Sequence, residues 1–232
     1  MFREGGDLVT FIEKHVRKIP ERSVLVVTSK IVALSEKRTA RIRNAKTREE
    51  LIKNESEFAI ETKYTWLTIK DGMVMSSAGI DESNANGKLI LLPKDSFKAA
   101  KSLRGKLKKI YRVRHLGILI TDSRLMPLRA GVVGVALGYA GFSGVRDYRG
   151  TPDIFGRKLE LARTDVADSL ATAAVLCMGE GKERLPLALI TNAPVDFRER
   201  VDESELHIDI DADIYKPLFN ALPRKSSRRK KR

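Results

Sequence analysis

The chain has 232 residues, of which 42% are hydrophobic and 32% charged, a balance typical of a folded protein rather than a disordered one. No apolar run approaches the roughly 20 residues of a membrane helix, and a single cysteine excludes an intrachain disulfide. The net charge is +14, but residues 224–232 contribute +7 and residues 94–114 contribute +8. We therefore expect a cytoplasmic protein without a membrane segment. Its basic tail is expected to be a disordered, solubilising end, with weak, nonspecific contact with nucleic acid as the alternative.

The N-terminal quarter predicts a helix, a strand and a second helix. Residues 7–19 carry apolar side chains at helical spacing and are followed by a proline. Residues 23–34 form an apolar, β-branched run, which predicts a buried strand that enters a polar turn at residues 28–30. The sequence Thr47-Arg-Glu-Glu50 has the pattern of a capping box and predicts a helix that extends to about Ala59.

The middle of the chain continues with short strands and one long helix. Residues 65–69 and 73–75 resemble short strands. Asp95 is suited to cap a helix with apolar side chains facing inward as far as Ile110, and lysines cover its other face. Residues 116–121 form an apolar strand, which Asp122 is expected to end.

Six glycines interrupt an apolar stretch at residues 131–150, as in strands that are bulged or closely approached by other backbone. Thr164 or Asp165 can cap a further helix that stops at Gly179, and residues 185–191 predict another strand. The helices and strands alternate without a regular βαβ rhythm. This pattern favours an α+β fold with mixed sheets and packed helices.

Several familiar constellations are absent. The three histidines have no metal-ligand spacing, and with one cysteine a structural zinc site is not expected. Cys177 falls on an apolar helix stripe, which predicts a buried, inert thiol. The glycine cluster does not read GxGxxG, and Gly181-Lys182 lacks both the first glycine and the Ser/Thr of a phosphate-binding loop.

Three acids remain at expected element ends. Asp81 lies in a Gly/Asn/Ser-rich turn, Asp122 follows a strand, and Glu180 follows a helix. Mg²⁺ and Mn²⁺ take oxygen ligands from a few carboxylates together with nucleotide phosphates, so acids at such ends can converge on a cation. Acids are also common in turns for purely structural reasons, and spacing alone favours that interpretation.

The sequence segments around these acids are more specific than the spacing of the acids. Distinctive segments occur in a fixed order between residues 7 and 190, and together they resemble the coenzyme F-420:gamma-glutamyl ligase family. These segments are SKIVALSEKR, SAGIDESNANG, ITDS with PLRAG, GVALGYAGF, DYRGTPDIFGRKL, ADSLATAAVLCMGEG and PLALI.

The resemblance implies an enzyme of the amide-forming ligase class. Members of that family use GTP to activate a substrate carboxylate as an acyl phosphate, which the amine of L-glutamate then displaces. Mg²⁺ or Mn²⁺ at two sites bridges nucleotide and protein, and K⁺ is a further activator. The family fold is α+β and forms an intertwined homodimer. The apolar stretch at residues 131–142, which we expect to be hard to bury in one small subunit, agrees with a dimer.

The resemblance also assigns roles to individual residues. Lys30 and Asp122 match catalytic positions. Such residues fit a physical need, because phosphoryl transfer to a carboxylate brings two anions together and positive charge must neutralise both. The expected metal ligands are Asp81, Asp122, Ser123 and Glu180. The expected nucleotide contacts are Ser29, Lys30, Asn84, Met178, Gly179, Glu180, Gly181 and Lys182.

The sequence departs from the family pattern at positions that bear on the acceptor. From the resemblance we expect the family's opening strand to be missing or truncated before Met1, and Leu128 replaces a usual tryptophan while Arg129 is kept. The leading expectation is an F-420-0-like acceptor. A folate, a peptide glutamate tail and a non-enzymatic polyanion-binding role remain as alternatives. We expect residues 1–222 to form the catalytic region, with two subdomains possible, and residues 223–232 to form a basic, disordered tail.

Overall fold

A computed structural model describes residues 1–41, 44–85 and 87–219, so the basic tail lies outside the described residues. The chain divides into two compact units, residues 1–41 with 80–205 and residues 42–79 with 206–232. The helices are α1 Leu8–His15, α2 Ser29–Ser35, α3 Ala45–Asn54, η1 Ser77–Gly79, α4 Ser96–Tyr111, α5 Val166–Met178 and α6 Lys216–Phe219. The strands are β1 Ser23–Thr28, β2 Thr39–Arg41, β3 Phe58–Glu61, β4 Trp66–Lys70, β5 Met73–Ser76, β6 Lys88–Ile90, β7 Leu116–Leu125, β8 Val132–Ala140, β9 Val145–Asp147, β10 Arg163–Asp165 and β11 Leu187–Ile190.

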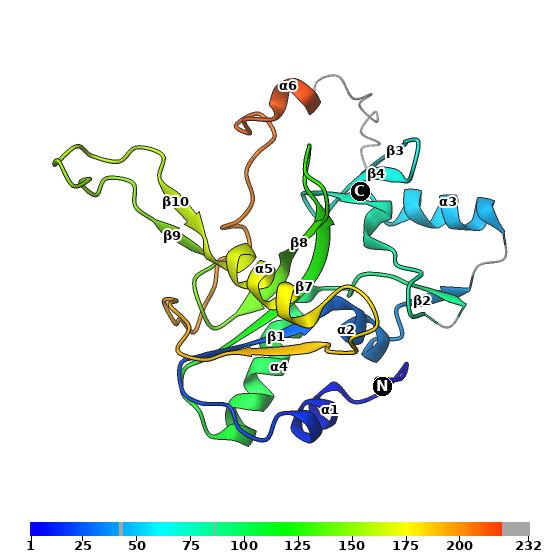
Figure 1. The fold of residues 1–232 in the computed structure, drawn as a ribbon, viewed down its shortest axis with the longest axis horizontal. Helices are drawn as coiled ribbons and strands as arrows, with labels where there is room; N and C mark the ends of the chain where they lie inside the picture. Colours follow the sequence, from blue (N-terminus) through cyan, green and yellow to red (C-terminus); the bar gives the residue numbers. More distant parts are fainter. Residues whose placement is uncertain (42–43, 86, 220–232) are drawn as a thin grey trace, which may run out of the picture. The chain divides into compact units, whose positions relative to one another are not determined.

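A four-stranded sheet forms the centre of the first unit, in the order β11-β1-β7-β8 (Figure 1). Strands β1 and β7 are parallel, whereas β11 and β8 pair antiparallel to them at the edges. Residues 24–27 and 116–121 are buried, so both faces of the sheet are covered, as expected for a mixed sheet between helices. The mixed sheets and helices confirm the predicted α+β class.

A β-bulge lets two helices approach opposite faces of the sheet. Ile120 pairs with Gly138 and Thr121 with Ala136, so Leu137 is an extra residue in β8. Gly134 and Gly138 would share a face in a regular strand, but the bulge turns them apart. A Cβ atom at Gly134 would lie 2.3 Å from the Ala171 carbonyl oxygen of α5, and one at Gly138 would lie 2.5 Å from the Phe97 nitrogen of α4. The expectation of bulged, closely approached strands is confirmed.

The second unit contains an antiparallel three-stranded sheet in the order β3-β4-β5, with helix α3 beside it. Thr68 is buried at its centre, where its hydroxyl donates to the Met75 carbonyl oxygen at 2.7 Å and accepts from the Ala78 amide at 2.8 Å. The two short strands predicted at residues 65–69 and 73–75 are confirmed.

Helix starts that depend on one local side chain were predicted well. Asp95 caps α4 by accepting from the Lys98 amide at 2.8 Å, and Asp165 rather than Thr164 caps α5. The capping-box prediction was wrong, because Asn44 caps α3 and accepts from the Thr47 amide at 2.8 Å. That helix ends at Asn54 and not near residue 59, where strand β3 has already begun.

Apolar runs were interpreted less accurately. The run at residues 23–34 is a strand only to Thr28 and then becomes helix α2, whose buried residues include Ile31 and Val32. Helix α1 ends at His15, short of residue 19, and β7 continues through Asp122 to Leu125 instead of ending at Thr121. Short apolar runs do not distinguish a strand from a buried helical turn.

Three predictions about burial were also wrong. Cys177 is exposed on α5, and Ile110 at the end of α4 is 41% exposed. Of residues 131–142, expected to be hard to bury in one small subunit, residues 134–142 are buried within this chain against α4 and α5, whereas residues 131 and 132 are exposed. The described residues contain no helix that combines the length and the apolar character needed to cross a membrane.

A charged contact fastens the segment near residue 199 to helix α4, and it makes the stability of the protein depend on pH. Arg104, 7% exposed, donates to both carboxylate oxygens of Glu199 at 2.8 and 3.0 Å, and Lys108 donates at 2.8 Å. These hydrogen bonds hold the pKa of Glu199 at about 2, below its ordinary 4.5. The Glu199 contact therefore contributes its full stabilisation of the folded state above about pH 4.5, and this contribution is lost as the pH falls toward 2.

We expect Glu199→Gln to lower the free energy of unfolding at pH 7 by about 1 kcal/mol, a small value because the carboxylate is largely exposed. The difference from wild type should shrink as the pH falls from 5 to 3, since the wild-type carboxylate then loses its advantage. Urea unfolding at several pH values measures both effects. Glu203→Gln, at an exposed position in the same segment, is the matched control. A difference that does not change with pH would contradict this account.

Candidate functional site

Two parallel strands bring four predicted site residues to one edge of the central sheet. Thr28 at the end of β1 pairs with Thr121 of β7. Ser29 and Lys30 follow the first of these residues, and Asp122 and Ser123 follow the second. The ends of neighbouring parallel strands are the usual location of ligand sites in such sheets. The sequence placed Asp122 after the strand, whereas it belongs to β7, which continues beyond it.

Asp122 is a poorly solvated carboxylate. The Ser29 hydroxyl donates to its Oδ1 at 3.3 Å. Burial raises the pKa of Asp122 above its ordinary value, the nearby charge of Asp81 adds to this, and the charge of Arg124 opposes it. The net increase means that the surroundings do not fully compensate the charge of the carboxylate. A cation at this position would stabilise it.

Lys30 and Asp81 form a charged pair at the same edge. The Lys30 Nζ lies 2.6 Å from Asp81 Oδ2 and also donates to the Ser83 carbonyl and hydroxyl oxygens at 3.1 and 3.0 Å. The Ser83 amide donates to Asp81 Oδ1 at 2.6 Å, which closes a tight turn. The lysine is therefore held beside the carboxylates with its ammonium group partly exposed.

Glu180 approaches the other side of β7. Its carboxylate accepts from the Ser123 hydroxyl at 3.0 Å. Successive side chains of a strand point to opposite faces, so this pair and the Asp122–Ser29 pair flank β7. The structure thus connects each of the three predicted acids to a partner that the sequence also indicated.

The three acids do not form one compact cluster. Over residues 1–41, 44–85 and 87–219, no three His, Cys, Asp or Glu side chains are grouped to hold a single metal ion. Asp81 and Asp122 are close enough to influence each other's charge. The donor set still fits Mg²⁺ or Mn²⁺, because these cations commonly use one or two carboxylates and take other oxygens from phosphates and water.

The predicted nucleotide-binding loop is buried at its first residue and exposed at the others. Met178 is buried at the end of α5, so its side chain packs in the core. Gly179 to Lys182 are exposed, and the Glu183 carboxylate folds back to accept from the Gly181 amide at 2.7 Å. Asn84 is exposed with a left-handed backbone, φ 54°.

Sequence reasoning missed two residues of this site. Ser83 holds both Lys30 and Asp81, and its position two residues after an aspartate is the signal of an Asx turn. Arg124 lies two residues after Asp122 and is 7% exposed. The period of a strand would have placed it on the same face, had β7 been extended past residue 121.

Comparisons with known proteins identify the family of the chain. The model of the family described as F420-0:Gamma-glutamyl ligase matches residues 1–192. A protein of Archaeoglobus fulgidus named coenzyme F420:L-glutamate ligase is 31% identical over 221 residues, 88% of each chain. Its counterpart in Methanosarcina acetivorans is 29% identical over 244 residues, 97% of this chain and 95% of that one.

A third relative aligns over a shorter region. The Methanococcus maripaludis protein of the same name is 40% identical over 130 residues, 56% of this chain and 52% of its own. In that comparison the chain spans about half the length of its relative. The family match nevertheless covers the sheet edge, the Lys30–Asp81 pair, Asp122 and Glu180. The chain belongs to the F420-0:gamma-glutamyl ligase family.

Proposed function

We propose that the chain is a GTP-dependent γ-glutamyl ligase that joins L-glutamate to the carboxylate of an F-420-0-like acceptor. The observation that carries this proposal is the meeting of Lys30, Asp81 and Asp122 at one sheet edge, in a chain of this family. A protein that merely bound polyanions would have no need for acids beside the lysine. The acids instead suit a cation that offsets phosphate charge.

The reaction would proceed in two steps. An oxygen of the acceptor carboxylate attacks the terminal phosphorus of GTP, and GDP leaves with the bridging oxygen. The glutamate amine then attacks the acyl carbon, phosphate leaves, and the amine loses a proton to give the amide. Both steps bring negative charges together, so positive groups at fixed positions lower the barrier.

Each site residue has a part in this proposal. Asp81 and Asp122 would hold Mg²⁺ or Mn²⁺, which would neutralise charge on the nucleotide phosphates. Glu180 and Ser123, hydrogen-bonded to each other, would provide oxygen ligands for a second cation. Lys30, already held by Ser83, would donate to a transferring phosphate oxygen. The exposed loop at residues 179–182 would contact the nucleotide.

The nucleotide, cation and substrate requirements of phosphate release test this proposal. Release of phosphate should require acceptor, L-glutamate, GTP and Mn²⁺ or Mg²⁺ together, and K⁺ should increase the rate. ATP in place of GTP should support little turnover. An F-420-0 acceptor, a folate and a glutamate-ended peptide, assayed in parallel, separate the acceptor classes. Phosphate release that depends on neither glutamate nor acceptor would contradict the ligase assignment.

We also propose that the chain forms a homodimer. The β9–β10 hairpin projects away from the rest of the first unit (Figure 1). Large apolar side chains along it are exposed, two of them at its tip. Ile154 is 91% exposed, Phe155 89% and Leu161 88%. Such side chains at the end of an extended arm suit contact with a second copy.

Light scattering at micromolar concentration should give the mass of a dimer, with an interface above ~2,000 Å² in total, as in obligate dimers. The double variant Ile154→Ser/Phe155→Ser should shift the mass toward the monomer. Tyr64→Ser, which removes an 86% exposed ring elsewhere, is the control and should leave the dimer intact. A wild-type monomer under these conditions would contradict the dimer.

A further inference from the structure

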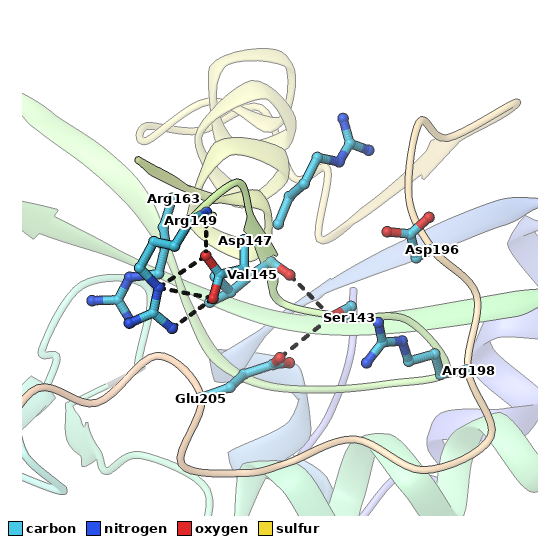
Figure 2. Close-up of a pocket in the computed structure, with 9 residues that line it drawn as sticks. Ser143, Val145, Asp147, Arg149, Arg163, Asp196, Arg198 and Glu205 are labelled. Carbon is cyan, nitrogen blue, oxygen red and sulfur yellow. Dashed lines mark hydrogen bonds and ion pairs between the residues drawn. The ribbon is translucent and has the colours of Figure 1, made fainter. Parts of the chain in front are cut away.

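A polar cavity of about 430 Å³ lies at the base of the β9–β10 hairpin. Figure 2 shows its walls, which come from residues 143–149, from β10 and from the segment at residues 196–205. Four arginines and three acids line it, a composition different from that of the Asp122 site. The residues that carry the argument are Arg149, Arg163, Arg198, Asp147 and Glu205.

Two of the three acids are already neutralised or fully hydrogen-bonded. Arg149 Nε lies 3.0 Å from each oxygen of Asp147, and this contact holds the pKa of Asp147 at about 2. Glu205 accepts from the Tyr139 hydroxyl at 2.6 Å, the Gly144 amide at 2.6 Å and the Ser143 hydroxyl at 3.3 Å. These carboxylates form part of the wall and are not open ligands.

Two arginines face the cavity without a hydrogen-bonded or ion-paired partner among the described residues. Within the described part of the chain, the side chains of Arg163 and Arg198 make neither a hydrogen bond nor a salt bridge, although Arg163 adds a longer-range attraction to Asp147. Arg146 donates to the Pro194 carbonyl at 2.6 Å and is attracted to Asp196. In Figure 2, Arg163 and Arg198 lie on different sides of the cavity.

We propose that this cavity binds a small anion with two or more phosphate or carboxylate groups. A guanidinium presents a planar pair of N–H donors that matches either group, and two of them on different walls suit a ligand with an anion at each end. The volume lies within the range of small-molecule sites.

This cavity is separate from Glu180 of the same chain. The Val166 and Ala167 amides at the start of α5 donate to the Gly144 carbonyl at the cavity, whereas Glu180 follows the other end of that helix. Thirteen helical residues span about 20 Å. A ligand of the size of the cavity therefore does not reach Glu180 of the same chain.

Calorimetric titration of the full chain tests the proposal. Pyrophosphate and citrate are titrated at low ionic strength without divalent cations, in a Lys30→Gln background that removes the ammonium group of the other site. We expect one saturable site for at least one probe, and the better probe identifies phosphate or carboxylate as the preferred group. The double variant Arg163→Gln/Arg198→Gln should weaken binding at least tenfold. Both positions are exposed, so the variant is expected to fold.

The control removes the same charge elsewhere. Lys98→Gln/Lys101→Gln alters the exposed face of α4 and should leave affinity within twofold of the parent. Equal weakening by both double variants would mean general attraction to a basic protein and would overturn the proposal, as would the absence of saturable binding by either probe. The readout does not depend on ligase activity, so failure of the proposed function and failure of this site are distinguishable.

Discussion

Replacement of Asp122 by asparagine should reduce glutamate ligation at least 100-fold, equivalent to about 3 kcal/mol in the barrier. Asparagine keeps the shape of the side chain and an oxygen for the Ser29 hydroxyl, which lies 3.3 Å from Oδ1. It removes the negative charge that would hold a cation against the nucleotide phosphates. The loss should be largest at limiting Mn²⁺, where affinity for the cation limits turnover.

The same substitution should not lower the melting temperature of the nucleotide-free protein. Burial and the neighbouring Asp81 raise the pKa of Asp122, so its ionised form costs stability above the ordinary carboxyl pKa. Loss of activity without loss of stability separates a ligand for the cation from a turn-forming residue. Asp71→Asn removes one charge from an exposed turn and is the matched control. Near-normal turnover of Asp122→Asn at limiting metal would contradict the site.

The second large effect concerns packing at Gly134. Replacement by alanine should lower the free energy of unfolding by about 3 kcal/mol, at the upper end of overpacking effects. The added Cβ would lie 2.3 Å from the Ala171 carbonyl oxygen and 2.6 Å from its carbon. These are backbone atoms of α5, so the helix must move from β8 as a unit. Its far end carries Glu180, and activity should fall along with stability.

Gly105 provides the control for this prediction. A Cβ atom there would meet nothing within 4 Å, and the residue lies inside α4. Gly105→Ala should therefore stabilise the protein by about 0.5–1 kcal/mol, because alanine favours the helix. Urea unfolding of both variants shows whether the free energy of unfolding falls for Gly134→Ala and rises for Gly105→Ala. If Gly134→Ala is as stable as wild type, the close approach of α5 to β8 is wrong.

Local chemistry explains which elements could be predicted from the sequence. Asp95 and Asp165 each form a hydrogen bond three residues along the chain, so nearby residues determine these two helix starts. The change from strand to helix after Thr28 depends on tertiary packing, since the same apolar residues suit either structure. The bulge at Leu137 likewise depends on β7 and both flanking helices.

The site was predicted in part for a similar reason. Resemblance to a family indicated Lys30, Asp81 and Asp122, but the 2.6 Å contact between Lys30 and Asp81 joins residues far apart in the chain. No spacing rule predicts such a pair. The cavity arginines were not foreseen either, because Arg163 and Arg198 come from separate segments that only the fold brings together.

Mass analysis of the acceptor tests the central claim most directly. The chain is incubated with GTP, Mn²⁺, labelled L-glutamate and an F-420-0 acceptor, beside the Asp122→Asn variant. The proposed function predicts that the wild-type reaction adds a glutamate-sized mass carrying the label to the acceptor, only when nucleotide and cation are present, and that the variant adds almost none. No mass increase on F-420-0, folate or peptide acceptors with either GTP or ATP would contradict it.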